Sequence, residues 1–482
     1  MRDYSLKAIR HKFRQIWGYE SFRKPQGEII LTLLQQRDAL IVMPTGGGKS
    51  LCFQLPAILQ TGLTLVISPL VALIENQVQE IQQLGLAGAS LHSQMPKYQK
   101  KRVLKQIENQ ELRLLYLSPE SLLSQSVWQK ISQPQIKLNG LIIDEVHCLV
   151  HWGESLRPAY RRLGAVRQAL LKNKPPASKI PLAAFTATAH PQAQATIIRT
   201  LQLINPAKFI LSPYRPNLNL KVKTIWTPKS RKNQALKFIS RQKKASGLVY
   251  VRSRSDSVNL ANWLQTFNYS VAEYHAGLPI ANKRKVERDW LKGKIQFVVC
   301  TSAFGMGINK SNVSWILHWQ TPLILPEYLQ EIGRGGRDGK PTTILALVSE
   351  PTGWFNGEDR RKKQFFRRQL VNFSQKVAQI AKKIPAHGTV QQVKEQFEQG
   401  EASLSLLHSL GDLQWLDPFS YQKLNKYQKN SFTKILENNI LLEREMQNYL
   451  CTKQCRWQFL LAAFGFSSRQ LCHHCDNCLK KN

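Results

Sequence analysis

A glycine-rich loop follows a short apolar run and precedes an apolar helical pattern. Its residues are Met43-Pro44-Thr45-Gly46-Gly47-Gly48-Lys49-Ser50. Small residues let the backbone wrap around a phosphate chain, with N–H groups and the helix N-terminus facing the phosphates. We expect Lys49 to reach the β- and γ-phosphates and Ser50 to ligate Mg²⁺. Met43 replaces the glycine of the general pattern, but the strand–loop–helix context still satisfies the mechanism.

Two adjacent carboxylates end a buried apolar run. Asp144 and Glu145 follow Leu141-Ile142-Ile143 directly. In an open parallel sheet, ligands bind outside the carboxyl ends of the strands. We therefore expect Asp144 to hold Mg²⁺ and Glu145 to orient and deprotonate the attacking water. An Asp-Glu pair alone is usually a solvated loop, but beside Lys49 it predicts nucleotide hydrolysis. His147 is either a structural histidine or a link from this site to the segment that follows.

Four of the eight cysteines have the spacing of a metal site. They are Cys455, Cys472, Cys475 and Cys478, in the pattern C-x16-C-x2-C-x2-C. Thiolates at short intervals on a turn can close one tetrahedral Zn²⁺ site, and four sulfur ligands leave no open position. A structural zinc site is therefore predicted, and in an intracellular protein this interpretation is favoured over disulfides. His473 or His474 could also substitute as a ligand.

Short apolar runs alternate with longer helical patterns from about residue 38 to 345. This rhythm predicts α/β domains with buried parallel strands and sites at the strand C-terminal ends. The strands are expected at 39–42, 63–67, 114–117, 140–143, 182–185, 247–251 and 296–300. The two prolines of Ser212-Pro213-Tyr214-Arg215-Pro216-Asn217 mark a linker between two such units. After residue 351 a basic helical segment follows, and 386–425 suggests two short helices, a turn and a strand in a winged-helix-like module.

The charge balance favours a polyanionic partner. The chain has 68 Lys and Arg against 31 Asp and Glu, a net charge of +37. An excess of this size, spread along a globular chain, points to nucleic acid; a solubilising surface is the alternative. No apolar run approaches the ~20 residues of a membrane span, and Met1–Lys7 lacks a secretion signal. A cytoplasmic or otherwise intracellular protein without a membrane partner is expected.

Several further motifs resemble those of superfamily-two helicases of the RecQ family. Phe22–Glu28 looks like the adenine-recognition motif, in which Gln26 and Arg23 would address the base and Tyr19 would stack on it. Ser68 and Pro69 begin a loop similar to one that touches DNA in that family. The remaining similar segments are 117–120, 186–189, 251–254, 274–278, 301–310 and 330–339. The resemblance covers residues 13–345 and the cysteine cluster, whose spacing matches the RecQ zinc subdomain.

The resemblance assigns arginines to both chemistry and DNA contact. Arg334 and Arg337 would reach the γ-phosphate when an interdomain cleft shuts, and the family gives the arginine-finger role to the position of Arg337. Arg254 matches a DNA-contacting motif.

Residues 147–160 resemble the aromatic-rich loop that senses single-stranded DNA, with Trp152 and Arg157 matching the family. Leu156 stands where the family carries Phe, so one aromatic contact is lost. The resemblance therefore leaves open whether DNA binding is coupled to ATP hydrolysis more weakly or in a different way.

The expected architecture is α/β, with two tandem RecA-like parallel-sheet domains and a mostly helical C-terminal region carrying the zinc module. The boundaries are 1–211, 212–350, 351–450 for the basic helical region with its insert, and 451–482 for zinc. ATP, Mg²⁺ and Zn²⁺ are the implied cofactors, and single-stranded and duplex DNA the implied partners. The function implied is 3′–5′ translocation on single-stranded DNA with duplex unwinding, in recombination and repair.

Two rival functions remain open, an RNA helicase and a nucleic-acid-binding protein that uses ATP only as a switch. The chain resembles a short RecQ form that stops after the zinc module, so preferences for forks or four-stranded DNA are not implied.

Overall fold

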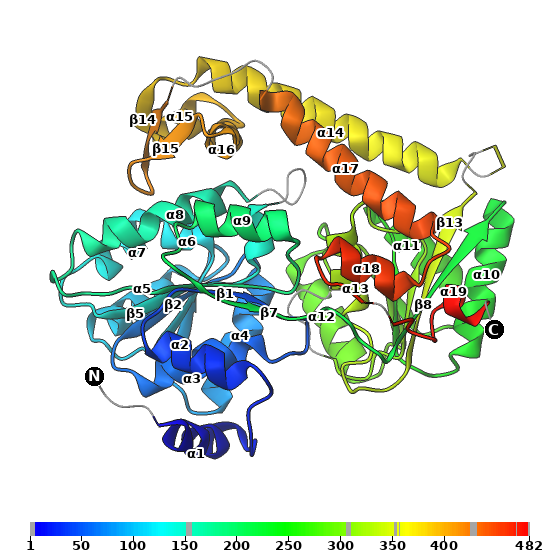
Figure 1. Cartoon of the computed structure of the whole chain (residues 1–482), viewed down its shortest axis with the longest axis horizontal. Coiled ribbons are helices and arrows are strands. Elements are labelled where there is room, and N and C mark those ends of the chain that lie inside the picture. The colour runs from blue at the N-terminus through cyan, green and yellow to red at the C-terminus, as the bar shows by residue number, and fades with distance from the viewer. Residues whose placement is uncertain are drawn as a thin grey trace. The chain divides into compact units, whose positions relative to one another are not determined.

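The computed structural model describes residues 5–150, 157–304, 310–350, 354–355, 357–424, 431–468 and 470–480. The segment 151–156, with Trp152 and Leu156, lies outside them. The chain folds into two compact units (Figure 1). The first comprises Met1–Leu211 and Leu370–Leu436, and the second comprises Ser212–Gln369 and Glu437–Asn482. No helix among the described residues is both long and apolar enough to cross a bilayer.

The first unit is built on a seven-stranded parallel sheet in the order β3-β4-β2-β5-β6-β1-β7. Its strands are β1 (Ala39–Val42), β2 (Leu63–Ile67), β3 (Gly88–Leu91), β4 (Leu114–Leu117), β5 (Leu138–Ile143), β6 (Leu182–Thr186) and β7 (Ala207–Ile210). Its helices are α1 (Leu6–Trp17), α2 (Gln26–Leu34), α3 (Lys49–Leu59), α4 (Val71–Gln83), α5 (Lys97–Glu108), α6 (Pro119–Leu122), α7 (Gln125–Ile131), the 3₁₀ helix η1 (Val146–Leu149), α8 (Pro158–Leu171) and α9 (Pro191–Thr200).

Both faces of this sheet are buried, which is why the strand sequences are continuously apolar. Leu40 and Val42 of β1 join the core on one face, whereas Ala39 and Ile41 join the core on the other. Because side chains alternate across a strand, each apolar run fills both cores at once. The strands expected at 39–42, 63–67 and 114–117 are confirmed with these bounds.

The second unit contains a six-stranded parallel sheet in the order β10-β11-β9-β12-β13-β8. Its strands are β8 (Leu218–Ile225), β9 (Gly247–Tyr250), β10 (Val271–Tyr274), β11 (Phe297–Cys300), β12 (Trp315–His318) and β13 (Thr342–Ser349). Its helices are α10 (Pro228–Arg241), α11 (Arg254–Gln265), α12 (Ile280–Leu291), α13 (Leu325–Ile332), α18 (Arg456–Ala463) and α19 (Asp476–Leu479). The expected fold class, two parallel-sheet domains with a helical C-terminal region, is confirmed.

The C-terminal helices cover the edge strand β8. The indole Nε1 of Trp457 donates to the Leu218 carbonyl at 3.2 Å, and the Val222 amide donates to the Asp476 carboxylate at 2.9 Å. The Arg456 guanidinium in turn pairs with Asp476. Satisfying the polar backbone of an edge strand in this way prevents pairing with another chain.

Two long helices connect the units to a small insert. α14 (Glu358–Lys383) starts in the second unit and ends in the first, and α17 (Ser431–Cys451) returns. The insert, residues 387–423, contains β14 (His387–Thr389), α15 (Val390–Gln396), α16 (Gly400–Leu410), β15 (Leu413–Trp415) and β16 (Ser420–Lys423). Its strands form an antiparallel sheet in the order β14-β16-β15. In Figure 1 the insert lies over α8 of the first unit.

His408 of α16 is a titratable group that this packing buries. Its ring lies 5.7 Å from that of Trp415, and Arg161 and Arg199 face it. Burial, reinforced by these two guanidinium groups, lowers the pKa of His408 to about 3. The folded protein therefore holds this imidazole neutral in mildly acidic solution, where the unfolded chain protonates it.

Acidification should accordingly weaken the fold. Because the folded pKa of His408 lies below its unfolded value, its contribution to stability is present above the unfolded pKa and is lost as pH falls. Between about pH 7.5 and about pH 5.5 the loss should be about 1 kcal/mol. His408→Gln should remove that part of the acid sensitivity in urea unfolding at both pH values, whereas the exposed control His11→Gln should not. An unchanged pH dependence in His408→Gln would contradict this burial.

Candidate functional site

The glycine-rich loop forms a tight cradle between β1 and α3. Gly46 and Gly48 have φ angles of +82° and +79°, a region that favours glycine. A Cβ on Gly47 would lie 2.7 Å from Cγ of Met43, and one on Gly48 would lie 2.4 Å from Nε2 of Gln26. Met43 itself is buried in the core. The conformation and close packing of the loop therefore favour glycine at these positions, and the buried Met43 side chain packs against Gly47.

The segment before α2 is fastened to this cradle. The Gln26 side-chain amide donates to the Gly47 carbonyl at 3.0 Å, and the Arg23 guanidinium donates to the Gly46 carbonyl at 3.3 Å. The Arg23 amide donates to Oε1 of Gln26 at 3.0 Å. Tyr19 follows the C-terminus of α1 and is 55% exposed. The residues predicted to recognise adenine thus flank the predicted phosphate loop.

Lys49 is the first residue of α3, and its ammonium group is buried. Its Nζ has no hydrogen-bond partner among the residues that the structure describes. Asp144 and Glu145 follow β5, and the charge of Lys49 acts on Asp144. Gln77 donates to Oγ of Ser50 at 3.3 Å. An unsatisfied buried cation at a helix N-terminus, behind a glycine cradle, fits the phosphates of a nucleotide.

Burial shapes the protonation of the carboxylate pair. It raises the pKa of Asp144 to about 6, with the charge of Glu145 adding to the effect and Lys49 opposing it. Glu145 has a φ of +47°, and its amide donates to Oδ1 of Asp144 at 2.9 Å. This backbone conformation is rarely adopted by residues other than glycine, and it is found here at the site where chemistry is expected.

His147 joins the carboxylates to the next strand end. Its Nδ1 lies 3.2 Å from Oε2 of Glu145 and 3.2 Å from Oγ1 of Thr186, the last residue of β6. Burial by itself lowers the pKa of His147, but Cys148 and Glu145 outweigh it and raise the pKa to about 10. A charged imidazole here pairs with the Glu145 carboxylate, while its Nδ1–H can donate to the Thr186 hydroxyl. The Thr186 hydroxyl passes its own hydrogen bond to the Thr188 carbonyl at 3.1 Å.

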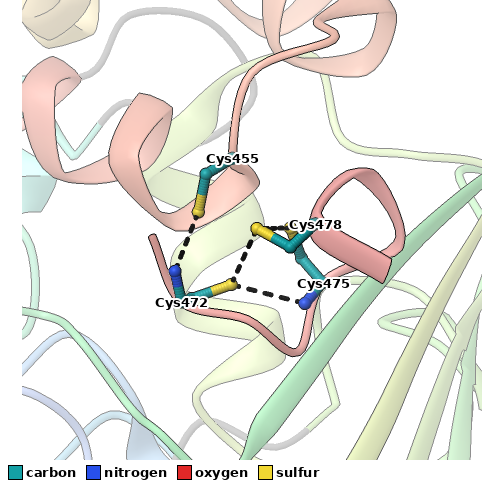
Figure 2. A group of neighbouring side chains, drawn as sticks. All are labelled: Cys455, Cys472, Cys475 and Cys478. Atoms are coloured by element: carbon teal, nitrogen blue, oxygen red, sulfur yellow. Dashed lines mark hydrogen bonds between the residues drawn. The ribbon is translucent and has the colours of Figure 1, made fainter. Parts of the chain in front are cut away.

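The four predicted cysteine ligands come together in the second unit. Their sulfur atoms all lie within 4.8 Å of one another (Figure 2). Sγ of Cys478 is 3.8 Å from that of Cys472 and 3.4 Å from that of Cys475. A tetrahedron with Zn–S bonds of about 2.3 Å has edges of about 3.8 Å. The cluster therefore has the dimensions of a closed zinc site.

Backbone amides orient these sulfur atoms. The amide of Cys472 donates to Sγ of Cys455 at 3.4 Å, and that of Cys475 donates to Sγ of Cys472 at 3.3 Å. Such outer hydrogen bonds stabilise thiolate ligands. Nε2 of His474 instead lies 3.3 Å from the Tyr214 hydroxyl. The ligand set is therefore the four cysteines, with His474 engaged elsewhere.

Comparisons with known proteins agree with both sites. The chain matches the DEAD/DEAH box helicase family over residues 23–196, the helicase conserved C-terminal domain over 230–339 and the RecQ zinc-binding family over 419–479. It is 49% identical over 477 residues to the ATP-dependent DNA helicase RecQ of Synechocystis, covering 98% of each chain. The chain belongs to the RecQ family of ATP-dependent DNA helicases.

More distant relatives show how far this likeness extends. The Haemophilus influenzae ATP-dependent DNA helicase RecQ is 40% identical over 341 residues, which are 71% of this chain and 53% of that one. The solved structure of Mss116p bound to single-stranded RNA and AMP-PNP has a TM-score of 0.61 at 13% identity, and covers 96% of this chain and 92% of that one. That structure shows the fold alone.

The predicted arginine-finger loop of this RecQ-family chain is held from within its own unit. Arg334 is buried, whereas Arg337 is half-buried. Arg215 donates to the Gly335 carbonyl at 3.2 Å, and Asn217 donates to the Gly336 carbonyl at 2.8 Å. Sequence reasoning treated the segment of Arg215 and Asn217 only as a linker. Its two prolines indicated an extended backbone but did not indicate this anchoring role.

The predicted DNA contacts are divided between the units. Ser68 and Pro69 follow β2 and are next to the carboxylate strand, because the Asp144 amide donates to the Ile67 carbonyl at 2.8 Å. Arg157 precedes α8 and lies 4.0 Å from Glu120. Arg254 begins α11 in the second unit and is exposed. Trp152, the predicted stacking residue, lies outside the described residues.

Glu145→Gln should separate hydrolysis from binding. Removing the negative charge should lower the turnover of ATP by about 100-fold or more, because general-base catalysis contributes this much. Nucleotide affinity in a fluorescence titration should change little. The matched control Glu111→Gln alters an exposed glutamate before β4 and should retain full turnover. Normal hydrolysis by Glu145→Gln would exclude it as the base.

Metal analysis should find about one zinc per chain, because four thiolates complete one coordination sphere. Cys475→Ser should lose the metal and lower the thermal unfolding temperature, since the cluster is part of the core that covers β8. Cys451→Ser removes an exposed thiol at the end of α17, four residues before Cys455, and should keep both zinc and stability. Full zinc occupancy in Cys475→Ser would contradict the assigned ligand set.

Proposed function

We propose that this protein uses ATP hydrolysis to translocate 3′ to 5′ along single-stranded DNA and to unwind duplex DNA, in recombination and repair. The observation that supports it most directly is the buried Lys49 ammonium group, unsatisfied within the described residues and placed beside Asp144 and Glu145. A cation in this state requires an anionic ligand. Curated relatives named ATP-dependent DNA helicases favour the triphosphate as that ligand and DNA as the track.

The hydrolytic roles follow from the groups at the strand ends. Lys49 binds the β- and γ-phosphates, and the cradle amides of Thr45–Gly48 bind the phosphate chain. Ser50 and Asp144 hold Mg²⁺, which neutralises phosphate charge when it is bound. Glu145 orients the attacking water and accepts its proton. His147 connects Glu145 with Thr186 and so with the next strand end.

Base recognition is assigned to Tyr19, Arg23 and Gln26. The exposed Tyr19 ring offers a stacking surface for adenine. Arg23 and Gln26 already contact the carbonyls of the cradle, so that their positions depend on the conformation of the loop. Occupancy of the base site is thereby coupled to the geometry of the phosphate site.

Arg337 is assigned the arginine-finger role. Its guanidinium is half-buried on a loop that Arg215 and Asn217 hold, which limits the entropy lost on engaging a phosphate. Arg334 is buried beside Tyr250 and Glu331 and supports the same loop. An added arginine of this kind accelerates phosphoryl transfer by about 10³–10⁵.

DNA binding is assigned to Ser68, Pro69, Trp152, Arg157 and Arg254, together with the large positive charge. Contacts to phosphates should make the affinity fall steeply with salt. Trp152 is proposed to stack on a base, which contributes about 1–3 kcal/mol. We place this activity in the cytoplasm, with the DNA.

A strand-separation assay tests the proposal. The wild-type protein with ATP and Mg²⁺ should unwind a duplex with a 3′ single-stranded tail, and a 5′-tailed duplex should remain paired. Lys49→Ala should still bind the tailed DNA but should neither hydrolyse ATP nor unwind, because it loses the phosphate contact. Binding without unwinding by the wild type would refute the helicase activity, and stronger stimulation of hydrolysis by RNA than by DNA would refute the choice of track.

A further inference from the structure

The insert packs on one side of α8, and α8 is more deeply buried than is usual for a helix on the face of a sheet. Nine consecutive residues of α8, from Ala159 to Arg167, are buried, including three arginines. A helix on the face of a sheet normally keeps a polar stripe in water. Here one side of α8 packs against η1 and α9, and the other packs against α16 of the insert.

Polar contacts fix α16 to the first turn of α8. Oε1 of Glu401 lies 3.2 Å from Nη2 of Arg162, and the side chain of Arg162 is only 9% exposed. The Ser405 hydroxyl donates to the Pro158 carbonyl at 3.3 Å. Ala165 of α8 belongs to the core cluster of the insert. The insert contacts the first unit at a second place, where Phe419, just before β16, packs edge-to-face against Trp128 of α7 with ring centroids 5.1 Å apart.

The first turn of α8 also holds the backbone of the hydrolytic loop. The Tyr160 hydroxyl donates to the Asp144 carbonyl at 3.0 Å, and the Arg161 guanidinium donates to the Leu149 carbonyl at 3.0 Å. These two carbonyls lie at either end of the loop that carries Glu145 and His147. A continuous series of hydrogen bonds and packing contacts therefore connects α16 to the carboxylates.

The same packing removes α16 from any role in reading nucleic acid. In a helix-turn-helix arrangement the second helix lies in the major groove and needs an exposed face. In α16 the residues Ala402 to Leu407 are all buried against α8, α14 and the insert's own sheet. Side chains in this environment cannot reach base edges.

We propose that the insert is an intramolecular brace, in which Glu401 and Ser405 are positioning residues that hold α8 and, through Tyr160 and Arg161, the loop of Asp144 and Glu145. The inference rests on the proposed ATP-driven function. A misplacement of about 1 Å in a catalytic group is enough to slow a reaction markedly. Loosening the brace should therefore lower the turnover of ATP more than it lowers ATP affinity.

Glu401→Gln, which keeps the shape of the side chain, tests the brace in the full-length protein. At saturating single-stranded DNA, kcat for ATP should fall by about threefold to tenfold, while KM for ATP stays within about twofold of wild type. The Kd for a fluorescent single-stranded oligonucleotide without nucleotide should be unchanged. Glu398→Gln, which alters an exposed glutamate of the same insert, should behave as wild type.

A charge exchange separates positioning from general damage. Arg162→Glu alone should lower kcat, and the double variant Arg162→Glu with Glu401→Arg should recover at least half of the loss, because it restores the ion pair in reverse. Thermal unfolding of each variant checks that it is folded. Wild-type kcat in Glu401→Gln, or a raised Kd for DNA at unchanged kcat, would overturn the brace. If the wild type itself shows no DNA-stimulated hydrolysis, the proposed function fails instead.

Discussion

A buried lysine ammonium group beside two carboxylates is the constraint on which the first unit depends. Within the described residues, Nζ of Lys49 has no hydrogen-bond acceptor, and leaving a buried cation in this state is costly. The parallel sheet brings Lys49 and Asp144 to the same carboxyl edge, so their charges partly offset each other before any ligand binds. Anionic phosphates would satisfy the lysine and the amides of the cradle together.

Neighbouring side chains hold the glycine cradle and the carboxylates in place. Gln26 and Arg23 bind the cradle from one side, and His147 pairs with Glu145 from another and also contacts Thr186. Within this network Glu145 has a positive φ, and its amide donates to Oδ1 of Asp144. Glu145 is thereby connected to the end of β6 through His147 by short, direct contacts.

In the second unit, side-chain contacts also hold the edge of the sheet in place. Its outer strand β8 would offer free backbone groups, but the zinc module covers it, with Asp476 and Trp457 taking its polar atoms. The linker residues Arg215 and Asn217, just before β8, also hold the loop of Gly335 and Gly336, which was predicted to carry the arginine finger. The four-cysteine cluster lies in the core of the same unit that carries Arg337.

Residue type and spacing were sufficient to predict the phosphate loop, the carboxylate pair, the four thiolates and most central strands. These features depend on local chemistry: the φ angles of the cradle favour glycine, and continuous apolar runs suit strands buried on both faces. Strands such as β7 and β8 were not predicted. They lie at sheet edges, where exposed lysines interrupt the apolar pattern.

The packing of the insert was decided only by the tertiary structure. Its two helices were predicted from the sequence, as part of a winged-helix-like module. Packing of α16 against α8, the ion pair of Glu401 with Arg162 and the burial of His408 join segments more than 200 residues apart. Contacts between such distant segments depend on how surfaces fit together in three dimensions, and no local pattern of residues records that fit.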